Sequence, residues 1–109
     1  MKNPTVVFPK AKEVVVEDRP MPEPKAGQVR VKTIRSLIST GTELTILSGE
    51  FPRDSFWAGY GKYPFVAGYS NFGVVEALGT GVDKSWLGKR VASFTHHAAF
   101  VTCGTGDLN

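Results

Sequence analysis

The stretch QVRVKTIRSLISTGTELTILSG, residues 28–49, changes from the pattern of a strand to that of a helix. In residues 28–36, one face holds Val29, Val31 and Thr33 and the other holds Arg30, Lys32 and Ile34, and this period of two is typical of a half-buried strand. Residues 42–48 place Leu44, Ile46 and Leu47 on one apolar face, and Gly49 follows where a helix commonly ends in a left-handed conformation. A strand that passes through a hydroxyl-rich turn into one short helix is therefore the centre of the predicted fold.

Outside this stretch the chain is mostly a series of short strands. Further strands are predicted at residues 5–8, 13–17, 72–78, 89–94 and 97–103. Three prolines between residues 20 and 24 exclude a helix there and predict an extended surface connection that Gly27 closes. Residues 51–65 are predicted as an aromatic loop that caps the core or lines a cleft. We expect a mainly β fold, a small, partly open barrel with one or two short helices.

Composition limits the class of protein and its partners. With 109 residues, of which 41% are hydrophobic, the chain has enough material for one compact domain, residues 1–109. The formal net charge of +3 comes from scattered basic residues, which predicts neither a nucleic-acid nor a membrane partner. The sequence contains no signal-peptide pattern and no apolar run of about 18 residues. The single cysteine, Cys103, fits a reducing compartment, so a cytoplasmic location is expected.

Thr40 and Glu43 form a Thr-x-x-Glu pattern directly before the predicted helix. This spacing predicts a capping box, in which the threonine oxygen and the glutamate carboxylate each accept a hydrogen bond from the other residue's backbone N–H group. The same helix start also concentrates free N–H groups that attract an anionic or carbonyl oxygen. A structural and a functional role of this turn are therefore compatible.

Three other features have simpler interpretations. The glycines of GTGVDK, residues 79–84, resemble a dinucleotide-binding turn, but no third glycine and no long helix follow, so a tight turn is predicted. His96 and His97 are neighbours on a predicted strand and point to opposite faces, so we expect one packed and one solvated histidine rather than a shared metal. Cys103 is expected to be a small buried apolar residue.

The order of several blocks resembles a known family. VVVEDRPMPEPKAGQVRVKTIRS, TELTILSGEFP, YPFVAGYSNFGVVEALGTGVD, LGKRVASF and HAAFV together resemble the N-terminal, GroES-like domain of the medium-chain dehydrogenase/reductase superfamily, which includes zinc alcohol dehydrogenases. The resemblance runs from about residue 5 to residue 101. Within the superfamily, ISTGTE and YPFVAGY look most like the branch of bacteriochlorophyllide-type dehydrogenases.

The resemblance also implies where zinc ligands are missing. Thr40 stands at the position of the cysteine that binds catalytic zinc in the family, Tyr69 at that of a histidine ligand, and Ser70 at that of the glutamate that follows it. The segment that carries four structural-zinc cysteines in many members is absent. Hydroxyl groups are poor zinc ligands beside thiolate and imidazole, so no metal is expected at this site.

The family resemblance implies an NAD(P)-dependent oxidoreductase that transfers hydride to or from a carbonyl, alcohol or activated alkene. Thr40, Thr42, Tyr69 and Ser70 are the implied catalytic residues, and Thr40, Gly41 and Thr42 the implied contacts to NAD(P)(H), with the choice between NAD and NADP left open. The aromatic loop supplies substrate contacts from Phe51, Trp57 and Tyr60. A Rossmann cofactor domain is expected downstream, so this part alone is expected to be inactive and the full-length protein is a candidate homodimer.

Two other functions remain open from the sequence. In the first, the domain would be a stand-alone binding or oligomerisation module, as in the co-chaperonin that gives the fold its name. In the second, it would be a relative that binds a ligand without catalysing a reaction. For Tyr69 and Ser70 the alternative to catalysis is a turn before the strand that starts near Phe72. A strand, a G-x-G-x-x-G turn and a helix encoded downstream would distinguish the oxidoreductase from the module.

Overall fold

The computed structural model describes residues 2–52 and 54–108, and strands dominate it. In chain order its elements are β1 (Lys2–Phe8), β2 (Val15–Pro20), β3 (Gln28–Ser36), α1 (Thr42–Ser48), α2 (Phe56–Tyr60), β4 (Phe65–Val66), β5 (Asn71–Leu78), η1 (Lys84–Trp86), β6 (Arg90–Ser93), β7 (Phe100–Gly104) and η2 (Thr105–Asp107). The hydroxyl-rich turn of the opening stretch lies between β3 and α1, as predicted.

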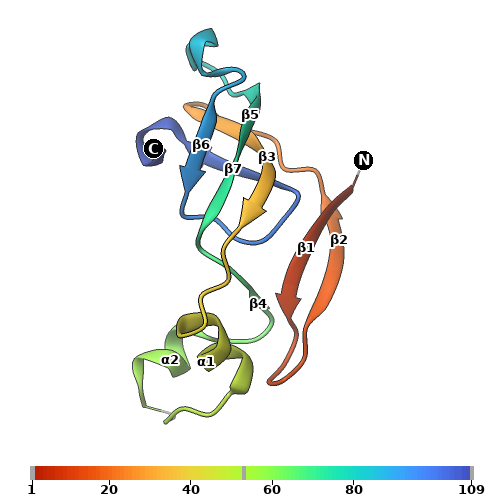
Figure 1. Ribbon diagram of the computed structural model, residues 1–109, viewed down its shortest axis with the longest axis vertical. Helices are drawn as coiled ribbons and strands as arrows, with labels where there is room; N and C mark the ends of the chain where they lie inside the picture. The colour runs from red at the N-terminus through yellow and green to blue at the C-terminus, as the bar shows by residue number, and fades with distance from the viewer. Residues whose placement is uncertain (1, 53, 109) are drawn as a thin grey trace.

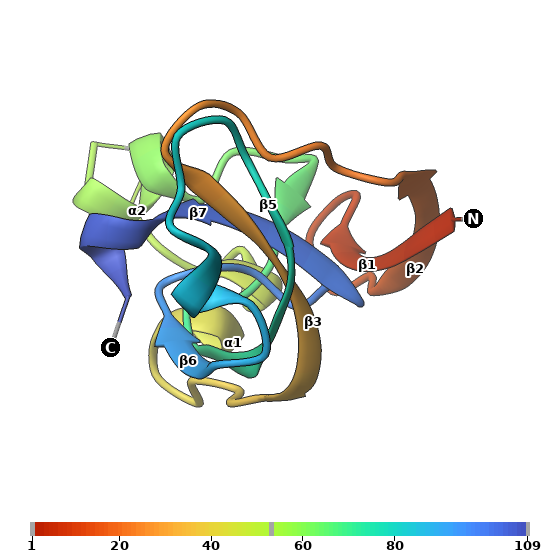
Figure 2. The same cartoon turned by 90° about the horizontal axis from the view of Figure 1, so that it is seen from above.

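The strands form two antiparallel sheets, one with the order β2-β1-β4 and one with the order β6-β5-β3-β7. The two helices lie at one end of the elongated molecule and the four-stranded sheet at the other (Figure 1). Seen along the long axis, the β1–β2 hairpin projects to one side of the four-stranded sheet (Figure 2). The described strands thus make an open pair of sheets rather than a closed barrel, which confirms the predicted mainly β, partly open fold.

Two apolar clusters hold these layers together. The first belongs to the four-stranded sheet and contains Val29, Val31, Val75, Val91, Ala98, Val101 and Cys103. The second joins α1 to the β1 sheet through Phe8, Ile46 and Ala67. Val29 and Val31 are fully buried, as the period of two in β3 predicts, and Cys103 is buried as expected. Gly49 ends α1 with a φ of 68°, which confirms the predicted left-handed termination.

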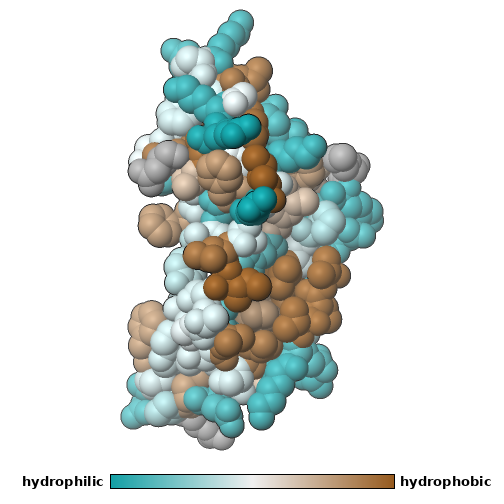
Figure 3. Space-filling view, viewed as in Figure 1, coloured by the Kyte–Doolittle hydropathy of each residue, from teal (hydrophilic) through white to brown (hydrophobic). Residues whose placement is uncertain are grey.

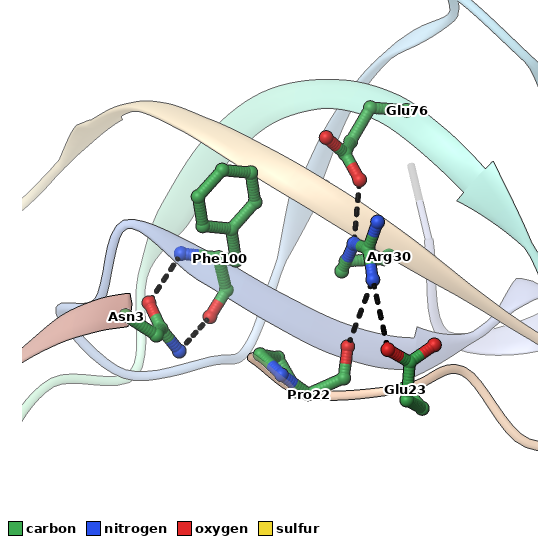
Figure 4. A network of polar contacts seen from close by, with 6 residues as sticks. All are labelled: Asn3, Pro22, Glu23, Arg30, Glu76 and Phe100. Atoms are coloured by element: carbon green, nitrogen blue, oxygen red, sulfur yellow. Dashed lines mark hydrogen bonds and ion pairs between the residues drawn. The ribbon is translucent and has the colours of Figure 1, made fainter. Parts of the chain in front are cut away.

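Polar contacts fasten the outer strands to this core (Figure 4). The side-chain amide of Asn3 donates to the carbonyl oxygen of Phe100 and accepts from its N–H group, both at 2.8 Å, so β1 is attached to β7. Arg30 on β3 donates to Glu76 on β5 at 2.5 Å and to the carbonyl oxygen of Pro22 at 3.3 Å. The proline-rich connection is therefore held against the four-stranded sheet.

The structure corrects several local predictions. The aromatic loop contains the helix α2, in which the ring of Phe56 stacks on that of Tyr60 and meets that of Trp57 edge to face. The strand predicted at residues 97–103 begins at Phe100, since the histidine segment bonds to both sheets instead of continuing one ladder. β1 begins three residues earlier than predicted, at residue 2, and β2 is displaced from the predicted residues 13–17 to residues 15–20. In the described part of the chain, no helix has the length and apolar character to cross a membrane.

The inward face of α1 also differs from the prediction. Ile46 is fully buried, but Leu44 is 49% exposed, and Glu43 takes an inward position with 3% exposure. The helix is turned this way because the Glu43 carboxylate has hydrogen-bond partners inside the fold, whereas Leu44 faces a surface pocket. A buried carboxylate on a short amphipathic helix is uncommon unless it is paired.

Candidate functional site

The turn before α1 is capped by Ser39. Its hydroxyl oxygen accepts from the N–H group of Thr42 at 3.2 Å, and its own N–H group donates to Oε2 of Glu43 at 2.8 Å. The predicted capping box between Thr40 and Glu43 is therefore wrong in its first residue. Because α1 begins at Thr42, its N-cap position falls on Gly41, which has no side chain to cap the helix, and Ser39 makes these two bonds from further upstream. Thr40 is left exposed at the surface of the turn.

A chain of short polar contacts connects Glu43, His97 and Ser36. Oε1 of Glu43 lies 2.6 Å from Nε2 of His97, and Nδ1 of His97 lies 2.6 Å from Oγ of Ser36. The side chains of His97 and Glu43 are only 9% and 4% exposed, whereas Ser36 is exposed. Each ring nitrogen of His97 therefore has one polar partner, the Glu43 carboxylate at Nε2 and the Ser36 hydroxyl at Nδ1.

His97 also packs closely against the segment that leads to Tyr69. Its N–H group donates to the carbonyl oxygen of Ala67 at 2.8 Å. A Cβ atom at Gly68, where φ is +104°, would stand 2.7 Å from Cδ2 of the imidazole, so only glycine leaves room for the ring. His97 thus contacts both the helix that carries Thr42 and the segment that carries Tyr69. His97 is the packed histidine of the expected pair, while His96 is half-buried and so only partly solvated.

Four predicted site residues meet at one cavity of about 250 Å³. Thr42 comes from α1, Trp57 and Tyr60 come from α2, and Tyr69 comes from the segment before β5. Phe56 completes the lining, and its ring stacks on that of Tyr60 with 5.4 Å between the centroids. The cavity is therefore lined on one part by two hydroxyl donors, Thr42 and Tyr69, and on the other by aromatic rings that pack against one another.

The remaining predicted residues lie elsewhere. Phe51 lines a separate cavity with Gly61 and Tyr63, and Ser70 lines another with Asn71 and Phe72. Ser70 uses its carbonyl oxygen to accept from the N–H group of Leu37 at 3.0 Å. Thr40 and Gly41 are exposed at the start of α1. The structure thus brings Thr42, Trp57, Tyr60 and Tyr69 together, but it does not add Phe51 or Ser70 to their cavity.

Two titratable groups near these elements have shifted pKa values. Burial is the main cause that lowers the pKa of His96 from 6.5, and Arg19 and His97 add to it. Burial also raises the pKa of the Cys103 thiol from 9.0, which keeps it protonated and unreactive. Across residues 2–52 and 54–108, no three His, Cys, Asp or Glu side chains gather in a way that could hold a metal ion.

Sequence reasoning missed the contacts of Ser36, His97 and Phe56. The helical spacing of Glu43 indicated a capping role, which it has, but the pattern contains no sign of its second partner 54 residues away. His97 lies in an irregular segment, so no periodicity indicates which way its ring points. One signal was available for Phe56, because it belongs to the aromatic run that was expected to line a cleft.

Comparisons with known proteins agree with this architecture. A family model described as "Alcohol dehydrogenase GroES-like domain" matches residues 25–109. Over 88 residues the chain is 35% identical to the starvation-sensing protein RspB of Escherichia coli strain K12, covering 81% of this chain and 24% of RspB.

Solved structures share the fold across nearly the whole chain. A short chain alcohol dehydrogenase (rspB) from E. coli CFT073, solved with its cofactor NADH, aligns with a TM-score of 0.81 at 22% identity, over 99% of this chain and 38% of that one. An alcohol dehydrogenase superfamily protein from Novosphingobium aromaticivorans aligns with a TM-score of 0.77 at 25% identity, over 99% of this chain and 33% of that one. The chain therefore spans about a quarter of RspB and about a third of each solved chain.

Proposed function

Since the chain belongs to the family of alcohol dehydrogenase GroES-like domains, we propose that it is the substrate-side domain of an NAD(P)-dependent oxidoreductase. The reaction is hydride transfer to or from a carbonyl, an alcohol or an activated alkene. The observation that carries the proposal is the cavity where Thr42 and Tyr69 face the aromatic residues of α2. A Rossmann domain in the same polypeptide would complete the enzyme, and residues 1–109 alone would be inactive.

The chemistry of the donors supports a reaction without zinc. The family positions of two zinc ligands hold Thr40 and Tyr69, and neither a neutral hydroxyl nor a phenol competes with thiolate or imidazole for Zn²⁺. Glu43 is the nearest carboxylate in sequence, and both of its oxygens already bind His97 and Ser39. These residues do not fit a catalytic zinc ion, so the proposed mechanism uses hydrogen bonds in its place.

Tyr69 and Thr42 are the proposed hydrogen-bond donors to the reacting oxygen. When hydride reaches a carbonyl carbon, negative charge develops on the oxygen, and donors placed beside that oxygen stabilise the transition state. In carbonyl reduction a hydroxyl proton also passes to the product alkoxide, and in alcohol oxidation it moves the other way. Trp57 and Tyr60 provide the wall against which a planar or apolar substrate packs, and Phe56 extends it.

NAD(P)(H), when bound, supplies or accepts the hydride. Thr40, Gly41 and Thr42 are the proposed contacts from this chain, since the turn is exposed and a Cβ at Gly41 would meet no protein atom within 4 Å. The open surface at this glycine allows close approach of a ligand to the backbone. Phe51 and Ser70 stay in the proposal as substrate contact and catalytic residue, respectively, of the assembled enzyme.

Turnover by the full-length protein tests this function. We expect nicotinamide-dependent reduction of aldehydes, quinones or enones that neither chelators nor added Zn²⁺ alter. Tyr69→Phe keeps the ring and removes the donor, so kcat should fall by about 10²- to 10³-fold, while Thr102→Val, on β7, serves as the hydroxyl control.

Stoichiometric zinc with chelator-sensitive turnover would refute the metal-free mechanism, and normal turnover by Tyr69→Phe would refute the donor role. A full-length protein that binds no nicotinamide would favour the binding module. A cytoplasmic homodimer is the proposed form of the enzyme, and its mass in solution tests the oligomeric state.

A further inference from the structure

The outer edge of β2 is open. Among the described residues β2 pairs with β1 alone, and it forms the outer strand of the three-stranded sheet. In Figure 1, β2 lies on the side of β1 that is turned away from the four-stranded sheet. An open strand edge presents a row of backbone N–H and C=O groups with which another strand can pair.

Three consecutive valines make this edge apolar. Val14, Val15 and Val16 are 53%, 38% and 68% exposed. In Figure 3, apolar side chains gather on the side of the molecule where the lower part of the hairpin lies. Lysine and proline commonly protect edge strands against pairing, and residues 13–19 contain neither. The edge of β2 is therefore suited to receive another strand.

The contacts of β1 show which backbone groups of β2 point outward. Val6 donates to the carbonyl oxygen of His97 and accepts from the N–H group of Ala67, so both of its backbone groups point away from β2. Val16 lies opposite Val6. Because hydrogen-bonded and non-hydrogen-bonded pairs alternate along an antiparallel ladder, the N–H and C=O groups of Val16 point to the open edge, and those of Asp18 do the same.

A second copy of β2 can pair with this edge about a two-fold axis in only a few registers. A register centred on Glu17 or on Asp18 sets two identical carboxylates opposite one another. A register centred on Val15 sets Glu13 opposite Glu17 of the second copy. Like charges directly opposite one another destabilise a strand pair, so all three registers are disfavoured.

The register centred on Val16 has no such conflict. Val16 faces Val16 of the second copy, Val15 faces Glu17, and Glu13 faces Arg19 with the opposite charge. Arg19 donates to Glu17 of its own strand through Nε and Nη2 at 3.2 and 2.9 Å, which leaves Nη1 directed to other acceptors. By symmetry the pairing between Glu13 and Arg19 occurs twice, so both ends of the paired strands carry complementary charges.

We propose that β2 pairs antiparallel with β2 of a second copy of this chain, with Val16 at the two-fold axis. The outward N–H and C=O groups of Val16 and Asp18 supply the hydrogen bonds, and the contacts between Glu13 and Arg19 set the register. The pairing goes beyond the oxidoreductase function proposed above and does not rest on it, since it uses neither the Thr42 cavity nor a nicotinamide.

Sedimentation of the full-length protein, without nicotinamide or substrate, measures this self-association. The native protein should associate through β2 with a Kd of about 10–300 µM, as expected for a small interface. Arg19→Glu sets like charges opposite one another at two places and should weaken the association by about five- to thirtyfold. Glu13→Lys should weaken it similarly. The double variant Glu13→Lys/Arg19→Glu exchanges the two charges and should restore it.

A second variant and a second measurement locate the contact on β2. Val16→Lys sets two cations at the two-fold axis and should abolish the association, while Ala92→Lys, on the exposed outer strand β6, should leave it unchanged. In hydrogen exchange, the N–H groups of Val16 and Asp18 should exchange more slowly as the protein is concentrated. The N–H group of Glu17, which points to β1, should be protected at every concentration.

Three results would overturn the pairing: a protein that stays monomeric at about 1 mM, undiminished association of Val16→Lys, or no recovery in the double variant. Slow exchange of the Val16 N–H group that does not depend on protein concentration would assign the edge to a segment of the same polypeptide, and would overturn the pairing too. Turnover tests the oxidoreductase function separately, so the failure of one proposal is distinguishable from the failure of the other.

Discussion

Removal of the Glu43 carboxylate should destabilise the fold more than any change at the exposed helix surface. Glu43→Ala breaks the 2.6 Å contact to His97 and the 2.8 Å contact to the Ser39 N–H group at once. Because both side chains of the pair are over nine-tenths buried, leaving His97 without its partner costs about 3–5 kcal/mol. Glu43→Gln keeps the shape and a neutral acceptor, so it should cost only about 1–2 kcal/mol.

Urea denaturation measures the free energy of unfolding of each variant, with Glu50→Ala as the control on the exposed residue that follows α1. The control should stay within about 0.5 kcal/mol of the native protein. Glu43→Leu combined with His97→Phe replaces both partners by apolar groups and should recover part of the loss. A loss below about 1 kcal/mol for Glu43→Ala would refute the reasoning, because it would mean that the pair is solvated or unformed.

Three further predictions concern the sheets and the titratable groups. Gly73→Ala should lower the free energy of unfolding measured in denaturant by about 1–3 kcal/mol, because its Cβ would stand 2.3 Å from the carbonyl oxygen of Lys32. Gly59→Ala is the control, since a Cβ there meets nothing within 4 Å, and it should be neutral or stabilising. Burial lowers the pKa of His96 below 6.5, so the unfolded chain binds this proton more readily and the stability of the fold falls as the pH drops through 6.5. His96→Gln should therefore reduce the fall in Tm between about pH 7.5 and 5.5. An unchanged slope of Tm against pH would contradict this. Cys103 should react with a disulfide reagent only after unfolding, since burial raises its pKa, and rapid modification of the native protein would contradict the structure.

The strands were predictable because their signals are local. The alternation in residues 28–36 and the glycine after residue 48 each depend on neighbours in sequence, and both predictions are confirmed. The helix α2 was missed because its five residues are too few for a periodic pattern, and aromatic stacking rather than propensity holds them. Short elements of this kind form only in their tertiary context.

The candidate site was predictable only in part. Thr42 and Tyr69 were selected through their place in the family pattern, and they do line one cavity. The partners of Glu43 were not predictable, since a contact between residues 43 and 97 leaves no trace in either local pattern. Whether Thr42 and Tyr69 act on a substrate stays a prediction that turnover must test.

The pairing of Asn3 with Phe100 has a consequence for how the protein is made. The first strand is fixed by residues 97 positions further along the chain, and Val6 likewise donates to the carbonyl oxygen of His97. During synthesis β1 and β2 can pair with each other early, but the contacts that attach β1 to His97 and Phe100 can form only after these residues have left the ribosome. Folding dominated by such distant contacts is slow, so this interval is when the nascent chain is most exposed to aggregation and has most need of a chaperone.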